Sequence, residues 1–175
     1  MVTLIKQDFL ENKKLYNEIE KSLREYLDIS IPITHVGSTA IPDICGKNII
    51  DVLIGAKDEK QFEEISKILE NRGFYSSAKS KTEVYQFFSS KDTETGSGDV
   101  HIHLVISNTE RYAEFIVLKE YLLNNKVEAQ NYSNFKKKII DDGIRERKEY
   151  KTVKSVYVTD LITRAKSWYE EEKLL

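Results

Sequence analysis

Residues 31–54 read IPITHVGSTAIPDICGKNIIDVLI, and this stretch decides the fold. It holds two short apolar segments, residues 31–36 and 48–54, that are rich in β-branched side chains and predict two buried strands. Each segment carries one polar side chain where a core residue is expected, His35 in the first and Asp51 in the second. An unpaired charge inside an apolar sheet costs several kcal/mol. We therefore expect these side chains to belong to a polar site.

A third apolar segment, residues 99–106, carries His101 and His103. Because residues two apart in a strand point the same way, the two imidazoles are expected to share one face. Two imidazoles at this spacing can reach one metal ion or one phosphate, and the alternative is a pair of partly exposed surface histidines. Residues 83–89 form a further strand candidate, and the polar, glycine-bearing residues 90–98 between the two strands predict an antiparallel hairpin.

The remaining residues show helical periodicity. Apolar residues recur at helical spacing from residue 9 to 27, and Asp58 begins a second helix that Gly73 ends. After the candidate N-cap Asn108, the pattern predicts helices over residues 109–123, 127–141 and 144–173, with a break at Gly143. This order predicts an α+β fold, a small mixed β-sheet with helices packed mainly on one side. We expect one domain, residues 1–175, with a sheet-bearing core at 1–107 and a helical C-terminal part at 108–175.

Composition excludes several classes of protein. The 175 residues include 32% charged and 40% hydrophobic residues, which is typical of a soluble globular protein, and the net charge of -2 argues against a dedicated nucleic-acid binder. No apolar run is long enough to span a membrane, and the first residues do not resemble a signal peptide. The single cysteine, Cys45, excludes an internal disulfide. We expect a cytoplasmic protein with no membrane partner, and its oligomeric state stays open.

The turn Gly37-Ser38-Thr39 is a candidate phosphate site. Glycine permits close approach, and the hydroxyls and following amides can donate to phosphate oxygens, although an ordinary strand-to-helix cap has the same composition. Asp51 on the next strand favours the phosphate interpretation, because Mg²⁺ takes oxygen ligands beside substrate phosphates. The alternative for Asp51 is a carboxylate paired with Arg, Lys or a backbone cap.

Several cations are candidates for phosphate contacts. Lys47 immediately precedes the Asp51 strand, where it either reaches a phosphate or is a solvated loop residue. Tyr132 with Lys136 and Tyr150 with Lys154 repeat one i, i+4 spacing that places a ring and an ammonium together on a helix face. The alternative is that the tyrosines are core and the lysines, including the run 136–138, are surface.

Taken together, these motifs resemble the GrpB-like family, a branch of the nucleotidyltransferase superfamily. His35-Val-Gly-Ser-Thr-Ala-Ile-Pro42 and Lys47-Asn-Ile-Ile-Asp51 are similar to the family patterns HxGST-A-hydrophobic-P and K-P-I-I-D. His101-Ile-His103-Leu-Val is the second anchor. Leu118-Lys119-Glu120-Tyr121-Leu122 resembles F-R-D-Y-L, and the Tyr132–Lys136 and Tyr150–Lys154 pairs follow it.

The resemblance implies a nucleotidyltransferase-like fold with a nucleotide site and a divalent metal. Related sequences occur alone or fused to dephospho-coenzyme A kinase, which implies nucleotide or coenzyme metabolism. The chain departs from the pattern at Leu53, where the superfamily has a second metal-binding carboxylate, and at Asp43 and Asn48, where the family has glycine and proline. Lys119-Glu120 replaces Arg-Asp, which keeps the charges but loses the bidentate guanidinium.

We therefore expect metal-assisted nucleotidyl or phosphoryl transfer to a small-molecule acceptor, with Asp51 as the catalytic residue. Asp51, His101, His103 and His35 are the expected metal ligands, and the histidines favour Mn, Zn or Ni over Mg. The residues expected to bind a nucleotide or phosphorylated small molecule are Gly37, Ser38, Thr39, Lys47, Lys119, Tyr132, Lys136, Tyr150 and Lys154. Two alternatives remain: a non-catalytic nucleotide- or metabolite-binding module, favoured by Leu53, and a His/Asp metal-dependent hydrolase.

Overall fold

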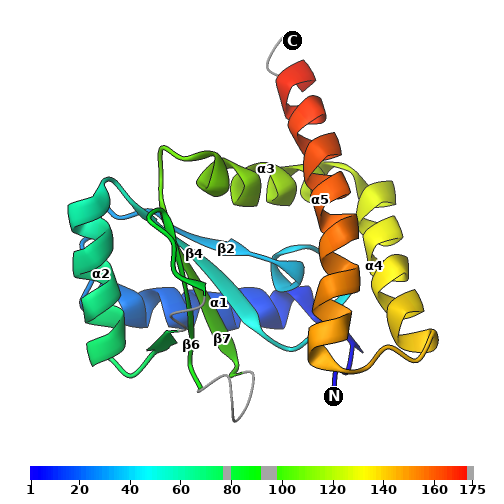
Figure 1. Cartoon of the computed structure of the whole chain (residues 1–175), viewed down its shortest axis with the longest axis horizontal. Coiled ribbons are helices and arrows are strands. Elements are labelled where there is room, and N and C mark those ends of the chain that lie inside the picture. Colours follow the sequence, from blue (N-terminus) through cyan, green and yellow to red (C-terminus); the bar gives the residue numbers. More distant parts are fainter. Residues whose placement is uncertain (77–79, 92–97, 173–175) are drawn as a thin grey trace.

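The computed structural model describes residues 1–76, 80–91 and 98–172. A five-stranded sheet with the order β2-β4-β7-β6-β5 lies at its centre (Figure 1). The strands are β2 (Ile33–Val36), β4 (Ile50–Ala56), β5 (Tyr75–Ser76), β6 (Tyr85–Ser89) and β7 (Val100–Ile106). β4 and β7 run parallel and the other neighbours are antiparallel. The mixed sheet of an α+β fold and its β6–β7 hairpin are thus confirmed.

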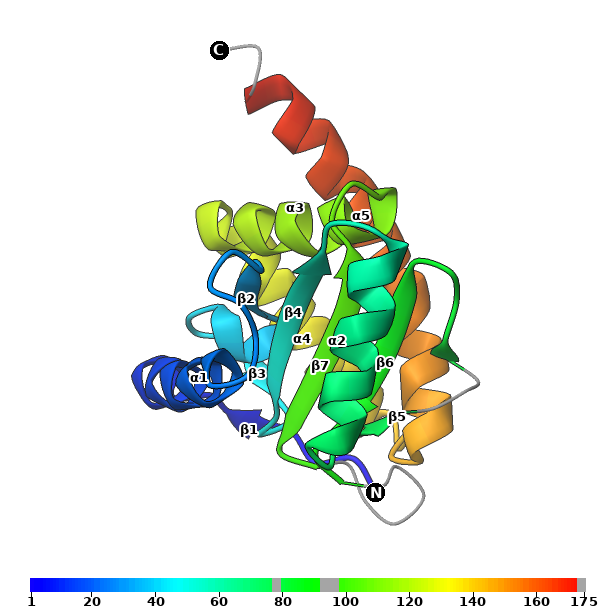
Figure 2. The same cartoon turned by 90° about the vertical axis from the view of Figure 1, so that its left-hand side faces the viewer.

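Helices α1 (Phe9–Arg24) and α2 (Glu59–Asn71) cover one face of the sheet. Figure 2 shows α2 in front of β4 and β7. The core on this face joins helical and strand side chains, among them Tyr16, Leu23, Phe62, Ile65, Leu69, Val52, Ile54, Ile102 and Leu104. Asp8 and Asp58 begin the two helices, because their side chains accept from the backbone N–H of Glu11 and Gln61 at 3.0 and 2.8 Å.

Helix α3 (Glu110–Asn124) packs on part of the opposite face, which the prediction of helices mainly on one side does not include. Its Tyr112, Phe115 and Ile116 contact a small apolar cluster of Val36, Leu53 and Val105 on the strands. The physical reason is that β4 and β7, as a parallel pair, carry apolar residues on both faces and need cover on both. The rest of this face carries Asp51, His101 and His103, together with the aromatic Phe87.

Helices α4 (Lys126–Asp141) and α5 (Arg147–Glu172) lie side by side at one edge of the molecule, and the end of α5 projects beyond α3 (Figure 1). Buried Leu161 and Ala165 of α5 pack with residues of α3 and α4. Thr109, and not Asn108, caps α3 by accepting from the Tyr112 N–H at 3.4 Å. No helix in the described ranges is both long and apolar enough to cross a bilayer.

Differences from the predicted elements are local. A two-stranded sheet of β1 (Ile5–Lys6) and β3 (Cys45–Gly46) is not predicted, because two-residue strands show no periodicity. β4 begins two residues later than expected, and residues 38–40 form one 3₁₀ turn. α5 begins at Arg147, where Glu146 accepts from the Glu149 N–H at 2.8 Å. Residues 92–97 of the predicted loop and Lys173 of the last predicted helix lie outside the described residues.

Candidate functional site

The parallel pairing of β4 with β7 brings Asp51 against the two histidines of β7. Asp51 pairs with His101, and Leu53 pairs with His103, so all four side chains lie on one face. His101 Nδ1 is 3.3 Å from Asp51 Oδ1, and His103 Nε2 is 3.6 Å from the same oxygen. One carboxylate oxygen therefore faces two imidazoles.

Asp51 is held in its ionised form. Burial acts to raise the pKa of Asp51, but hydrogen bonds from His101 and His103 outweigh burial and keep the pKa well below its usual range. The Asp51 side chain is 25% exposed, whereas those of His101 and His103 are 14% and 16% exposed. The carboxylate is thus the most accessible of the three groups.

Gly37, between β2 and the 3₁₀ turn, makes room for this carboxylate. Its φ is +74°, a conformation that favours glycine, and a Cβ at this position would collide with the side chain of Asp51. The sequence pattern predicts that this glycine gives a phosphate close access to the backbone. In the structure the group that approaches it is the Asp51 carboxylate.

A cavity of about 130 Å³ opens beside Asp51. It gathers residues from distant parts of the chain: the turn after β2, the connection between β3 and β4, strand β7, and helices α4 and α5. Beside Asp51, its lining includes Ser38, Lys47, His101, Lys136, Tyr150 and Lys154. Among the described residues that line the cavity, three are lysines and one is a carboxylate. The cavity therefore favours an anionic ligand.

The lysines of the cavity are held by aromatic rings and polar atoms. Lys47 Nζ lies 5.1 Å from the centroid of the Tyr150 ring, and Lys136 Nζ lies 4.4 Å from that of Tyr132. Lys136, 2% exposed, also donates to Ser38 Oγ at 2.9 Å and to the carbonyl oxygen of Cys45. It is therefore not part of a solvated surface, unlike Lys137 and Lys138, which are exposed.

Burial disfavours the protonated form of these lysines. It lowers the pKa of both Lys47 and Lys136 to about 8, and the nearby charge of Lys154 adds to the effect. Burial also lowers the pKa of Lys154 itself. A bound anion would reverse these shifts, because opposite charge favours the protonated ammonium.

The structure does not bring His35 into the Asp51 group. In the antiparallel pairing of β2 with β4, Val36 lies opposite Asp51 and His35 lies opposite Val52, so His35 projects from the other face. There its ring stacks on Tyr16 with centroids 4.6 Å apart. Burial lowers the pKa of His35 to about 4. The expectation that His35 completes a metal site with Asp51 is therefore corrected.

Three other residues that were expected to bind the ligand do not line the cavity. Thr39 is buried, and its hydroxyl donates to the Ile49 carbonyl at 3.2 Å and lies 3.0 Å from His35 Nε2. Tyr132 is a buried residue of α4 whose ring stacks on that of Tyr157, 5.9 Å away. Lys119 is half-buried on α3 and does not line the cavity.

Sequence reasoning missed the aromatic residues of β6 that contact the histidines. The Tyr85 hydroxyl lies 3.0 Å from His103 Nδ1, and the Phe87 ring meets that of His101 edge-on at 4.9 Å. The sequence carries part of the signal, because two-residue alternation places residues 85 and 87 on one face of their strand. The register of β6 against β7, which puts that face with the histidines, is seen only in the structure.

Asp51, His101 and His103 are the groups nearest to a possible metal ion in the cavity. One carboxylate and two imidazoles are a donor set that Mn, Zn and Ni accept. Among the described residues, however, no group of three or more His, Cys, Asp or Glu is arranged so that it could hold a metal ion. Leu53, opposite His103, is fully buried and supplies no second carboxylate. The residues present do not form a complete protein metal site.

Comparison with known proteins identifies relatives along most of the chain. The GrpB protein family matches residues 5–164. The chain belongs to the GrpB family. The glutamate-rich protein GrpB of Alkalihalophilus pseudofirmus is 27% identical over 156 residues, which cover 87% of this chain and 90% of that protein. A UPF0157 protein of Halalkalibacterium halodurans is 26% identical over 154 residues, covering 87% of this chain and 76% of that protein.

Solved structures show that the GrpB fold is shared. The crystal structure of the conserved protein GrpB from Enterococcus faecalis matches with a TM-score of 0.81 at 18% identity, over 95% of this chain and 99% of that one. The Cid1 poly(U) polymerase with bound MgGTP gives a TM-score of 0.44 at 11% identity, over 67% of this chain and 38% of that one. The second likeness is too distant to carry an argument about activity.

Proposed function

We propose that this GrpB-family protein binds the phosphates of a nucleotide or another phosphorylated small molecule in the Asp51 cavity and catalyses nucleotidyl or phosphoryl transfer. The observation that supports this most directly is the convergence of Lys47, Lys136 and Lys154 beside Asp51. Lys136 is buried and Lys47 and Lys154 are half-buried, and all three have pKa values lowered by burial. Phosphate oxygens beside them would favour the protonated ammonium and accept charged hydrogen bonds.

Ser38 fits the same role. Lys136 donates to its Oγ, so the Ser38 hydroxyl hydrogen points to another acceptor, and Ser38 lines the cavity. A phosphate oxygen is such an acceptor. In this proposal Lys136 acts partly by orienting Ser38, while Lys47 and Lys154 contact the ligand.

Asp51 is suited to contact a cation and is a poor proton acceptor, because its pKa lies far below neutrality. Since the described residues form no complete metal site, we propose that a divalent ion (Mn, Mg, Zn or Ni) enters with the phosphates as part of a metal–nucleotide substrate. The role of the histidines is then to hold Asp51 ionised and oriented.

Binding of tripolyphosphate and of ATP, each with Mg, Mn, Zn or Ni, tests the proposal by calorimetry. We expect Lys154→Met to weaken tripolyphosphate binding by about tenfold or more, as for the loss of a charged hydrogen bond. Asp51→Asn is expected to weaken the metal–ATP complex more than metal-free ATP. Lys137→Met, at an exposed lysine of α4, is the matched control. The proposal fails if the wild type binds neither ligand, or if Lys137→Met and Lys154→Met weaken binding equally.

A binding module without turnover is the second candidate, and Leu53 favours it, because two-metal transfer chemistry needs a second carboxylate. Incubation with labelled nucleotides and a panel of acceptors separates the two functions. A labelled acceptor indicates transfer, a labelled hydrolysis product indicates a hydrolase, and tight binding with no product indicates the module.

A further inference from the structure

An aromatic surface lies next to the phosphate cavity on the same face of the sheet. Phe87 pairs with His103 across β6 and β7, so its side chain projects on the side of Asp51 and the histidines. Its ring centroid is 4.9 Å from that of His101 and 5.7 Å from that of His103. We call Phe87, His101 and His103 the aromatic shelf. His101 also lines the cavity, so the shelf and the cavity are continuous.

Phe87 does not belong to the apolar core. Its neighbour Phe88 is fully buried on the opposite face, whereas Phe87 is half-buried and joins none of the apolar clusters formed by the described residues. The ring contacts recorded for Phe87 are with the two imidazoles. An aromatic ring that is partly open to solvent and beside convergent polar groups is typical of a small-molecule site.

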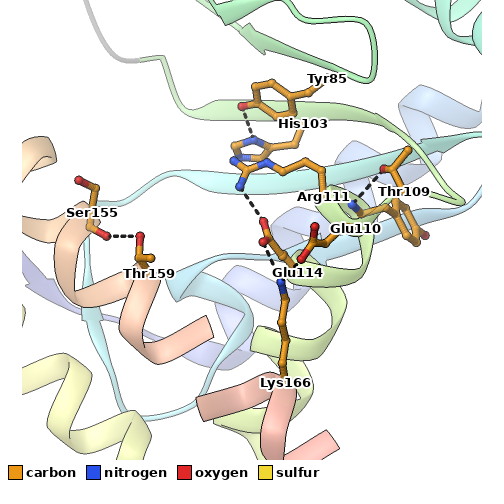
Figure 3. Close-up of polar contacts among 10 residues, drawn as sticks. Tyr85, His103, Thr109, Glu110, Arg111, Glu114, Ser155, Thr159 and Lys166 are labelled. Atoms are coloured by element: carbon orange, nitrogen blue, oxygen red, sulfur yellow. Dashed lines mark hydrogen bonds and ion pairs between the residues drawn. The ribbon is translucent and has the colours of Figure 1, made fainter. Parts of the chain in front are cut away.

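Side chains of β6 and α3 hold the aromatic shelf in position. The Tyr85 hydroxyl reaches His103 Nδ1 at 3.0 Å, and the Phe115 ring lies 4.8 Å from that of His103. Arg111 lies over the Tyr85 ring at 5.1 Å and donates to Glu114 at 3.1 Å, and Glu114 in turn accepts from Lys166 of α5 at 3.0 Å. Figure 3 shows the contact of Tyr85 with His103 and the contacts of Arg111 with Glu114 and of Glu114 with Lys166. A surface held in this way loses little freedom when a ligand stacks on it.

We propose that the aromatic shelf binds the base of a nucleotide whose phosphates occupy the lysine cavity. The substrate class is then nucleotides, as opposed to sugar phosphates or polyphosphates. This inference rests on the proposed function for the position of the phosphates. The base stacks on Phe87, on one side of His101, and the phosphates reach Lys47 and Lys154 on the other.

Calorimetry with ATP, ribose 5-phosphate and tripolyphosphate tests the shelf, using Phe87→Leu and Phe87→Trp. Stacking of a base on an aromatic side chain corresponds to an affinity change of about fivefold or more. We expect Phe87→Leu to weaken the binding of ATP by that factor and to leave the affinities for ribose 5-phosphate and tripolyphosphate unchanged. Phe87→Trp should bind ATP as tightly as the wild type does. Phe74→Leu is the control, because Phe74 is a half-buried phenylalanine that packs on the core of the other face.

Any other result of these binding measurements contradicts either the shelf proposal or the proposed function, and the pattern shows which. If Phe87→Leu weakens all three ligands equally, Phe87 has a structural role and the shelf proposal is wrong. If tripolyphosphate binds through Lys154 but ATP binding does not depend on Phe87, the shelf fails and the phosphate cavity stands. If ATP binding depends on Phe87 but not on Lys154, the phosphates lie elsewhere, and it is the proposed function that fails. Thermal melting of each variant separates loss of the site from loss of the fold.

Discussion

At Gly37, the absence of a side chain allows Asp51 to occupy its position. Gly37→Ala is expected to destabilise the protein in two ways. A positive φ combined with a ψ of −170° costs about 1–3 kcal/mol for a residue with a Cβ, and the Cβ also collides with Asp51. Gly73→Ala is the comparison without a collision, because its φ is also positive, at +86°, and no described atom lies within 4 Å of a Cβ built there. Urea unfolding should show a larger loss for Gly37→Ala, accompanied by loss of phosphate binding. Equal losses would show that Asp51 does not need this space.

Leu53 is a second residue whose replacement is informative. A carboxylate at this position would match the two-carboxylate pattern that the nucleotidyltransferase resemblance implies, but Leu53 is fully buried against Val36 and Val105. We expect Leu53→Asp to destabilise the protein by about 3 kcal/mol or more, because an unpaired charge enters an apolar cluster. Leu53→Met, which keeps the volume, should cost less than about 1.5 kcal/mol. Unfolding midpoints compare the two. A Leu53→Asp variant of normal stability with tighter Mn binding would contradict this expectation.

At the scale of elements, helix α5 is attached by apolar contacts more than by charge. Leu161 is fully buried between α5 and its neighbours, whereas Lys166 forms partly exposed ion pairs with Glu110 and Glu114 of α3. Leu161→Ala should cost about 2–5 kcal/mol, and Lys166→Ala about 1 kcal/mol or less. Chemical denaturation checks both values. A larger effect of Lys166→Ala would mean that the ion pairs, not the core, dock the helix.

The long helices and strands could be predicted from the sequence, because a hydrophobic period becomes visible only over several helical turns or several strand residues. The helices and the strands β2, β4, β6 and β7 follow from that pattern, with differences of a few residues at their ends. The two-residue strands β1, β3 and β5 depend on pairing with distant segments, which local sequence does not encode. The prediction for His35 fails for the same reason. Its identity fits a site, but the register of β2 against β4 decides which face it occupies.

The site itself was partly predictable. That His101 and His103 share a face follows from two-residue alternation, but their meeting with Asp51 depends on β4 and β7 being neighbours. The position of the lysines could be known only from the whole fold, because Lys136 and Lys154 reach the cavity from α4 and α5, far along the chain from Asp51. Phe87 was overlooked because an apolar residue in a strand is indistinguishable from core until its register is known.

For the whole molecule, the buried lysines set the pH dependence of stability. Lys47 and Lys136 have a folded pKa of about 8 against an ordinary value of 10.5. Between these values the unfolded chain binds more protons than the folded protein, so the free energy of unfolding should rise with pH above about 8. Buried tyrosines such as Tyr132 and Tyr150 have raised pKa values, so they reverse the trend once the pH passes the ordinary tyrosine value of 10.0.

Urea denaturation at intervals from pH 7 to 11 measures this curve. We expect a maximum between about pH 8 and 10, and a smaller rise in Lys136→Met than in the exposed-lysine control Lys137→Met. Phosphate affinity should fall over the same interval as the ammonium groups lose their protons. A steady decrease in stability from pH 7 upward would contradict the assignment of buried, charged lysines.

The parallel pairing of β4 with β7 has a kinetic consequence. Asp51 and His101 are 50 positions apart in the chain, and parallel strands cannot be joined by a tight turn, so the chain between them crosses over through α2, β5 and β6. Contacts between distant positions form slowly in folding, because the chain loses the entropy of loop closure before these contacts stabilise it. The carboxylate therefore meets its imidazoles only when the crossover is complete. During synthesis, a nascent chain presents no such site until β7 has emerged and paired, and ligand binding reports a finished fold.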